Sequence, residues 1–290
     1  MKQWKIGIMG GSGLYQLDAL EDPVWVEVET PWGAPSDSLL TGTISGVECV
    51  FLPRHGRGHV IGPSQLNFRA NIDALKRMGV TDVVSISAIG SLAEHMAPGD
   101  FVVVDQFIDR TFARPKSFFG QGLVAHVSMA DPVCPRLSSL VAAAAEKAGA
   151  NVHRGATYLA MEGPQFSTRA ESHMYRGWGA HVIGMTAMPE AKLAREAELP
   201  YALVGMVTDY DCWRENEAPV EVEAVIAQLM ANAEKGRDLV ARLAASLPSE
   251  RAASPLDTIL DFALITDPGK RDPEMLAKLD AVAGRVLNLG

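Results

Sequence analysis

Short apolar runs of strand length recur along the chain, and segments with helical spacing of apolar residues lie between them. Residues 5–9 and 201–207 are mostly apolar, as is typical of strands that are buried on both faces of a sheet. Apolar residues recur at helical spacing in 67–78, 135–149 and 220–246. Strands that alternate with helices predict an α/β fold with one active face.

Several predicted strands end in glycine or in a side chain with a hydroxyl or carboxyl group. The strand at 5–9 runs into a glycine turn, the strand at 82–88 into Ile89-Gly90-Ser91, and the strand at 201–207 into Thr208-Asp209. In open α/β sheets, ligands bind at the carboxyl ends of the strands. The pattern therefore predicts that the functional residues gather at this edge of the sheet.

Two aspartates one residue apart follow the strand at 201–207. In Thr208-Asp209-Tyr210-Asp211-Cys212-Trp213 the spacing keeps Asp209 and Asp211 close together, whether the strand continues or a loop begins. Two carboxylates at the end of a buried strand are an unusual choice for packing alone, which favours a catalytic role. A solvated loop with an acidic cap for the next helix is equally compatible with this hexapeptide.

The glycine turn Gly10-Gly11-Ser12-Gly13 can present backbone amides to a ligand. A dinucleotide-binding fingerprint in this register would need glycine at position 16, which is Gln16. We therefore disfavour a dinucleotide site. A phosphate cradle that includes the Ser12 hydroxyl and a plain structural turn both remain open.

The segment 53–63 concentrates positive charge in an acidic chain. A net charge of −9 and a pI near 5.3 disfavour nucleic acid or an anionic membrane as a general partner. The segment nevertheless contains two arginines and two histidines, so Arg54 and His55 could hold a bound anion. His55 and His59 have the spacing of metal ligands on a helix, but the glycines between them disfavour a helix and hence a metal site. Loop histidines without a role are the remaining alternative.

Two segments lie outside the regular alternation. Residues 109–131 form a long irregular stretch with three phenylalanines and His126, which predicts a cover over a site or an interface. Residues 247–290 begin as a linker and continue with helical patterns near 256–263 and 273–287. We expect one catalytic domain at 1–246 and a C-terminal linker and helical tail at 247–290 that packs on the same domain.

The cysteines and the lack of long apolar runs bear on the compartment. Three cysteines lie far apart, so they predict neither a disulfide framework nor a zinc site. The N-terminus lacks the apolar core of a signal peptide, and no run reaches transmembrane length. We expect a cytoplasmic protein.

Taken together, the motifs resemble the trimeric purine nucleoside phosphorylase family, and within it the methylthioadenosine branch. The matching segments are collinear over residues 1–245, roughly the first five sixths of the chain: Gly10-Gly11-Ser12-Gly13-Leu14, Arg54-His55-Gly56, Pro63-Ser64 through Asn71, Ser87-Ala88, Gly90-Ser91-Leu92, Pro98-Gly99-Asp100, 105–111, 162–167, Arg169-Ala170-Glu171-Ser172, Met185-Thr186 and 208–213. The resemblance implies a single-domain α/β/α sandwich with a mixed central sheet, and a homotrimer. It also implies inorganic phosphate as co-substrate, with no metal and no further cofactor.

The resemblance also implies which residues form the site. The phosphate-binding residues would be Ser12, Arg54, His55, Ser87, Ala88 and Thr186. The residues that bind the base and the ribose would be Phe166, Met185, Asp209 and Asp211. Substrate choice would depend on Ser167 and Val222, and His126 would reach the site of a neighbouring subunit. The chain departs from the family at Gly184, where relatives often carry a larger polar residue.

In such a phosphorylase, phosphate displaces a purine from C1′ of the sugar through a cation-like transition state. The leaving base needs a proton at N7, and water must be excluded so that hydrolysis does not compete. Asp209 is the expected general acid, provided that apolar walls or Asp211 raise its pKa. Its second oxygen could accept a hydrogen bond from a 6-amino group, which favours 5′-methylthioadenosine as the substrate, cleaved to adenine and 5-methylthioribose-1-phosphate.

Two alternatives remain. One is a phosphorylase of methylthioinosine or of ordinary 6-oxopurine nucleosides, which Asp209 disfavours; the small apolar Val222 further disfavours nucleosides with a 5′-hydroxyl. The other is a nucleoside-binding protein without catalytic activity, which the presence of Arg54, Ser87 and Asp209 disfavours.

Overall fold

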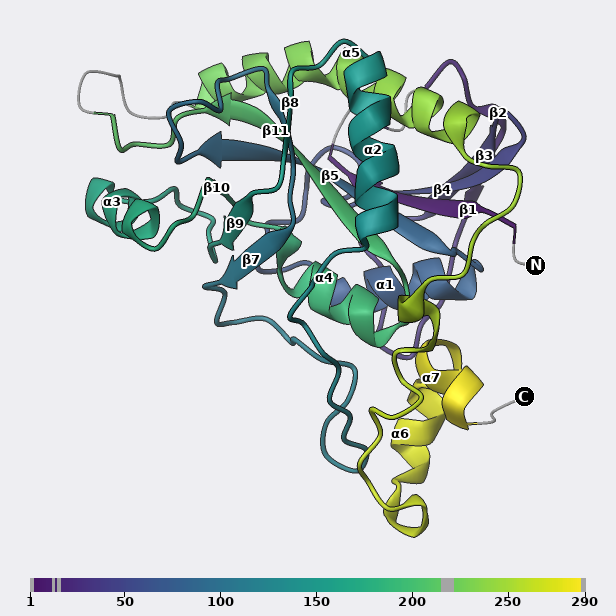
Figure 1. The fold of residues 1–290 in the computed structure, drawn as a ribbon. Helices are drawn as coiled ribbons and strands as arrows, with labels where there is room; N and C mark the ends of the chain where they lie inside the picture. Colours follow the sequence, from purple (N-terminus) through teal and green to yellow (C-terminus); the bar gives the residue numbers. More distant parts are fainter. Residues whose placement is uncertain (1–2, 12–13, 15–16, 215–221, 288–290) are drawn as a thin grey trace.

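The computed structural model describes residues 3–11, 14, 17–214 and 222–287. Its strands form one mixed sheet in the order β2-β3-β4-β1-β5-β10-β9-β7, while β11 pairs with β5 and continues to β6 and β8 (Figure 1). The strands are β1 (Lys5–Gly10), β2 (Glu21–Val26), β3 (Leu39–Ile44), β4 (Val47–Pro53), β5 (Asp82–Ser91), β6 (Phe101–Val103), β7 (Gln106–Asp109), β8 (Val152–Arg154), β9 (Thr157–Ala160), β10 (Val182–Gly184) and β11 (Tyr201–Asp209).

Helices cover both faces of this sheet. Successive strand residues point to opposite faces, so Val84 and Val204 face a core shared with α2 and α5, whereas Val83 and Leu203 face one shared with α1 and α4. The predicted α/β fold with a large mixed sheet is therefore confirmed. The helices are α1 (Phe68–Arg77), α2 (Pro135–Lys147), α3 (Arg169–Gly177), α4 (Ala187–Glu196), α5 (Val222–Ser246), α6 (Pro273–Lys278) and α7 (Asp280–Leu287). Among the described helices, none has both the length and the apolar character needed to cross a membrane.

The central strand β5 has an edge that two different strands share. β1 runs parallel to it as far as the pair Met9–Ser85, and β10 joins it antiparallel only from Gly90 onward. Between them, residues 86–89 have no strand partner on this edge among the described residues, although β11 pairs with their other edge. We call residues 86–89 the β5 gap. Because β1 and β4 both end beside it, the gap lies at the carboxyl edge of the sheet.

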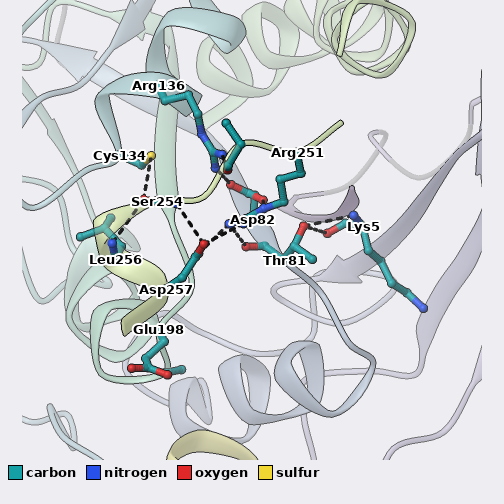
Figure 2. A network of polar contacts seen from close by, with 12 residues as sticks. Lys5, Thr81, Asp82, Cys134, Arg136, Glu198, Arg251, Ser254, Leu256 and Asp257 are labelled. Atoms are coloured by element: carbon teal, nitrogen blue, oxygen red, sulfur yellow. Dashed lines mark hydrogen bonds and ion pairs between the residues drawn. The ribbon is translucent and has the colours of Figure 1, made fainter. Parts of the chain in front are cut away.

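The C-terminal tail is fastened to the opposite end of β5. Arg251 donates to Asp82 at the start of β5 and also to both carboxylate oxygens of Asp257, at 2.7 and 2.8 Å (Figure 2). Arg136 of α2 donates to the same Asp82 carboxylate. The Asp82 side chain is fully buried and that of Arg251 is 2% exposed. In this buried ionic cluster, Arg251 of the tail thus provides a second cation, beside Arg136, for the Asp82 carboxylate.

Replacing Arg251 should test how much this cluster stabilises the fold. Arg251→Ala leaves the Asp82 carboxylate buried with one cation fewer, so we expect the free energy of unfolding in urea to fall by about 3 kcal/mol. Arg242→Ala is the matched control, since Arg242 forms an exposed i,i+4 pair with Asp238 at 2.6 Å and should cost less than about 0.5 kcal/mol. Equal losses for the two variants would contradict the proposed role of the cluster.

The tail then runs alongside the long irregular segment 109–131. The amide of His126 donates to Ala263 O at 2.9 Å, and the amide of Ile265 donates to Val124 O at 3.0 Å. The two segments extend together from the body of the molecule (Figure 1). The prediction of a helix near 256–263 is wrong. Only a short 3₁₀ helix forms, at Pro255–Thr258, because the chain then turns to pair with residues 124–126. The pattern at 273–287 forms two helices, α6 and α7. The division at residue 246 stays a prediction.

Candidate functional site

Two hydroxyl groups meet at the β5 gap. Ser87 lies in the gap, and Thr186 immediately precedes α4; their side-chain oxygens are 3.2 Å apart. Thr186 makes no side-chain cap bond to its helix, so its hydroxyl is not committed to the helix end. Ala88 lies next to Ser87, whose hydroxyl donates to Ala88 O at 3.0 Å. The structure therefore brings three of the predicted phosphate ligands together beside an unpaired strand edge, which suits an oxyanion.

Arg54 follows β4 and is almost fully buried beneath the gap. Its Nε and Nη2 atoms donate to the two Glu190 carboxylate oxygens at 2.8 and 3.3 Å. Tyr201 donates to Glu190 as well, at 2.8 Å. The sequence suggested that Arg54 could hold a bound anion; in the structure its guanidinium binds the Glu190 carboxylate through two nitrogens, because a buried guanidinium needs a counterion. Nη1 donates to Ile86 O, in the gap, at 3.2 Å.

His55 is oriented by a backbone carbonyl. Its Nδ1 donates to Ile61 O at 2.9 Å, since a carbonyl can only accept, and Nε2 therefore carries the lone pair. Burial and the neighbouring Arg54 charge lower the pKa of His55 to about 4, so the ring is neutral near pH 7. The His59 ring stacks on the His55 ring, with ring centroids 4.3 Å apart. No cluster of three or more metal-ligating side chains occurs among the described residues.

The two aspartates lie at the end of β11, directly beside the gap. Asp209 accepts from the Thr208 hydroxyl at 2.6 Å through Oδ2, and from the Asp211 amide at 2.7 Å through Oδ1. Both aspartates border Gly90, where an added Cβ would lie 3.0 Å from Asp209 Oδ1 and 3.6 Å from Asp211 Cβ. Asp211 has a positive φ of 51°, a conformation that aspartate tolerates better than most residues. This turn keeps the two carboxyl groups together after the strand ends.

Burial is the main reason that the pKa of Asp209 is raised. The Thr208 hydroxyl and the Asp211 amide partly oppose this rise. The sequence analysis gave two possible causes of a raised pKa, an apolar surrounding or the charge of Asp211. The structure favours the first, because burial has the largest effect. Burial also raises the pKa of Asp211, the Ser172 hydroxyl opposes that rise, and the Asp209 charge adds to it. A carboxyl group that is protonated more readily than usual can act as a general acid.

The residues expected to bind the base lie in two loops on either side of the aspartates. Phe166 is 45% exposed, and Met185 is half-buried, with its sulfur packed against Gly163. The Cys212 thiol donates to Ser167 O at 3.2 Å, which fixes the loop that contains Phe166 and Ser167 beside the loop after β11. An exposed aromatic ring next to half-buried carboxyl groups is a suitable platform for a purine.

Arg114 and Glu162 connect these loops, and the sequence analysis missed both. Arg114 donates to Met185 O at 2.5 Å, to Met188 O at 2.7 Å and to Glu162 O at 2.6 Å. The Glu162 carboxylate accepts from the amides of Phe112 and Ala113 and from Arg114. Although burial alone would raise it, the Ser64 hydroxyl and these amides lower the pKa of Glu162 to about 2. Arg114 is one of two arginines in the stretch 109–131, and its sequence context does not indicate this contact.

The side chains of two predicted positions are not described by the structure, and a third position, His126, has no described contact with this cluster. Ser12 is outside the described residues, and so is the side chain of Val222, at which α5 begins. His126 is exposed on the segment that extends from the body with the tail (Figure 1). No described contact joins it to the site of its own chain.

Comparison with known proteins identifies the family. Residues 5–245 match the family described as the phosphorylase superfamily. The chain is 65% identical to the S-methyl-5′-thioadenosine phosphorylase of Cereibacter sphaeroides, over 97% of this chain and 98% of that one. It is 58% identical to the protein of the same name from Rhodospirillum rubrum, over 99% and 98%.

Solved structures agree with the sequence comparison. A methylthioadenosine phosphorylase from an Antarctic soil metagenomic library is similar at 47% identity with a TM-score of 0.92, covering 97% of this chain and 99% of that one. The methylthioadenosine phosphorylase of Schistosoma mansoni in complex with adenine is similar at 39% identity with a TM-score of 0.79, covering 83% and 91%. The chain belongs to the phosphorylase superfamily.

Proposed function

We propose that the protein catalyses the phosphorolysis of 5′-methylthioadenosine to adenine and 5-methylthioribose-1-phosphate. The observation that carries this proposal is the β5 gap, where the hydroxyls of Ser87 and Thr186 meet 3.2 Å apart beside the half-buried Asp209, whose pKa is raised. An oxyanion site next to a readily protonated carboxyl group is what displacement of a purine by phosphate requires. The names of the relatives at 58–65% identity support the same substrate.

The phosphate site consists of the groups around the gap. Ser87 and Thr186 donate their hydroxyls, Ala88 its amide, and Arg54 offers the Nη1 edge that is not bound to Glu190. His55 points its Nε2 lone pair away from Ile61, which suits the protonated oxygen of hydrogen phosphate. Ser12 completes the set from the glycine turn. Inorganic phosphate is thus a co-substrate, and the proposal needs no metal or organic cofactor.

The nucleoside lies over the end of β11. Asp209 protonates N7 of the leaving base and accepts a hydrogen bond from the 6-amino group, while Phe166 and Met185 contact the purine. Asp211 fixes Asp209 through its backbone amide at 2.7 Å. Ser167 and Val222 tune the choice of nucleoside, and the small Val222 suits a methylthio group rather than a 5′-hydroxyl.

Release of the free base separates this proposal from its alternatives. We expect adenine release from methylthioadenosine that depends on added phosphate, with a lower kcat/KM for methylthioinosine and for inosine under the same conditions. Faster cleavage of methylthioinosine would favour a 6-oxopurine enzyme. Tight binding of methylthioadenosine without any release of adenine would favour a nucleoside-binding protein.

We also propose a homotrimer in the cytoplasm, in which His126 of one subunit completes the site of its neighbour. The segment 109–131 and the tail expose large apolar side chains: Phe112 is 81% exposed, Phe262 99% and Ile265 61%. Such a group of exposed apolar residues is typical of a contact surface between proteins.

A charge on this surface should dissociate the assembly. We expect Phe262→Glu to reduce the mass measured by light scattering from that of a trimer to that of a monomer, and to abolish most of the activity. Val24→Glu, at a position 56% exposed on the edge strand β2, is the control and should change neither. A monomeric Phe262→Glu protein with full activity would contradict the role of His126, and a wild type that is itself monomeric would contradict the assembly.

A further inference from the structure

Gly184, at which the resemblance suggested a departure from the family, lies against the side chain of Tyr158. A Cβ atom added to Gly184 would overlap the Tyr158 hydroxyl and would lie 2.7 Å from Cζ of the same ring. Distances below 3.0 Å do not occur for real side chains without a shift of the neighbour. The ring therefore excludes any larger residue at position 184, and the glycine provides the space for the ring.

The pairing of β9 with β10 explains this contact. Tyr158 lies opposite Val182, and Ala160 lies opposite Gly184, in a parallel register. Residues 158, 160, 182 and 184 therefore share one face of the sheet. The Tyr158 ring lies across this face from its own position towards Gly184, two residues before Thr186.

The Tyr158 hydroxyl is buried without a hydrogen-bond partner. The residue is 0% exposed, and its Oη atom makes no hydrogen bond within the described part of the chain. The Phe107 ring packs edge-on against it, with ring centroids 5.9 Å apart, so the ring itself is held in an apolar layer. A buried hydroxyl without a partner is rare in native proteins, and an absent ligand or a functional role is a usual explanation.

The polar groups nearest to this hydroxyl belong to the start of α4. Burial raises the pKa of Tyr158, and this rise is opposed by the Thr186 amide, the charge of Arg54 and the Thr186 hydroxyl. Thr186 in turn lies 3.2 Å from Ser87 across the β5 gap. The hydroxyl therefore lies beside Gly184 and next to the residue that presents the Thr186 hydroxyl to the β5 gap.

We propose that Tyr158 is a positioning residue of the phosphate site: its hydroxyl occupies the space that Gly184 leaves open and orients the hydroxyl of Thr186 towards the bound anion. This inference rests on the proposed phosphorolysis. Because the Ser87 hydroxyl donates to Ala88 O, Thr186 is the donor in its contact with Ser87, and its Oγ1 lone pairs can accept from Tyr158. A hydrogen bond from Tyr158 then fixes the direction in which Thr186 donates, towards the bound phosphate. Tyr158 thus supplies the polar group in the space that a larger residue at position 184 would occupy.

Removing only the hydroxyl tests the positioning role. We expect Tyr158→Phe to raise the KM for phosphate about three- to tenfold, the usual range for one hydrogen bond. The KM for methylthioadenosine should change less than twofold. Phe107→Leu is the matched control, because it alters the packing of the same ring and leaves the hydroxyl in place. A purely structural role would lower the unfolding temperature and shift both KM values alike.

An exchange of the two residues provides the second test. We expect Gly184→Asn alone to lower phosphate use severely, because its side chain would overlap the Tyr158 ring. Combining it with Tyr158→Val removes the overlap and restores a polar group in the same space. The double variant should therefore have a KM for phosphate at least tenfold lower than Gly184→Asn alone. A double variant no better than the worse single variant would contradict the proposed exchange of roles.

Phosphate binding measured directly separates this proposal from the enzymatic one. Calorimetric titration with inorganic phosphate should give a Kd three- to tenfold weaker for Tyr158→Phe than for the wild type, whichever nucleoside the enzyme uses. If the wild type binds phosphate but releases no adenine from methylthioadenosine, the proposed function fails while the role of Tyr158 is still measured. An unchanged phosphate Kd in Tyr158→Phe overturns the inference.

Discussion

Replacing Asp209 with asparagine should lower kcat/KM for methylthioadenosine by about 10²–10⁴-fold at saturating phosphate, the usual range for loss of a general acid. Asparagine keeps the shape of the side chain, but it has no proton to deliver to N7. The two hydrogen bonds of Asp209 predict how the amide is oriented. The Asp211 backbone amide, 2.7 Å from Oδ1, can only donate, so the oxygen of asparagine takes that position. The Thr208 hydroxyl, 2.6 Å from Oδ2, can rotate to accept from the amide NH₂.

This orientation directs a donor towards the base, which predicts a change of substrate preference. A 6-oxo group can accept from the NH₂ of the introduced asparagine, whereas the 6-amino group of adenine would meet another donor. Activity on methylthioinosine should therefore fall much less than activity on methylthioadenosine, or rise, because a buried polar site discriminates through unpaired groups. kcat/KM for both nucleosides, measured with wild type and Asp209→Asn, checks the expectation.

Asp211→Asn is the matched control for this experiment. Asp211 reaches Asp209 through its backbone amide, which the substitution keeps, so we expect both substrates to lose less than tenfold. Equal losses on both nucleosides in Asp209→Asn would mean that Asp209 does not read position 6 of the base. A larger loss in Asp211→Asn would move the acid to Asp211.

Replacing Arg54 should have the second largest effect, on both activity and stability. Arg54→Ala removes a charged donor from the β5 gap, and we expect a loss of about 2–4 kcal/mol of transition-state stabilisation in the reaction with phosphate. It also leaves the Glu190 carboxylate, which is 0% exposed, without its counterion. An uncompensated buried charge costs about 3–5 kcal/mol of folding free energy.

A paired substitution separates these two effects. Arg54→Met combined with Glu190→Leu removes both charges, and well-packed apolar residues often replace a buried ion pair at little cost in stability. We therefore expect the double variant to unfold close to the wild type in urea and still to use phosphate poorly. A folded double variant with unchanged KM for phosphate and unchanged kcat would show that Arg54 serves only the fold.

The sequence predicted the elements and the edge of the sheet at which the site lies, because both follow from local patterns. The helix expected at 67–78 begins at Phe68, where the Asn67 side chain accepts from the Ala70 amide at 3.2 Å. The polar residues at the ends of β5 and β11 do lie side by side. The two strands are parallel neighbours, so their carboxyl ends reach the same edge of the sheet.

The partners of the site residues could not be predicted in this way. Glu190 lies 136 residues from Arg54, and Arg114 lies 71 residues from Met185. Such pairs depend on how the layers pack, and the local sequence around either residue contains no sign of the other. The contact between Gly184 and the Tyr158 ring likewise could not be predicted, because it depends on how β9 pairs with β10. The tail was misjudged for the same reason, since its pairing with 124–126 replaces the helix that its own spacing favours.

The formation of a sugar–phosphate bond tests the central claim most directly. Phosphorus NMR of the purified protein with methylthioadenosine and inorganic phosphate should show a sugar 1-phosphate ester that appears in equimolar amount with free adenine. No adenine should be released when phosphate is omitted. Release of adenine at the same rate without phosphate, or without a phosphate ester, would contradict phosphorolysis at the β5 gap.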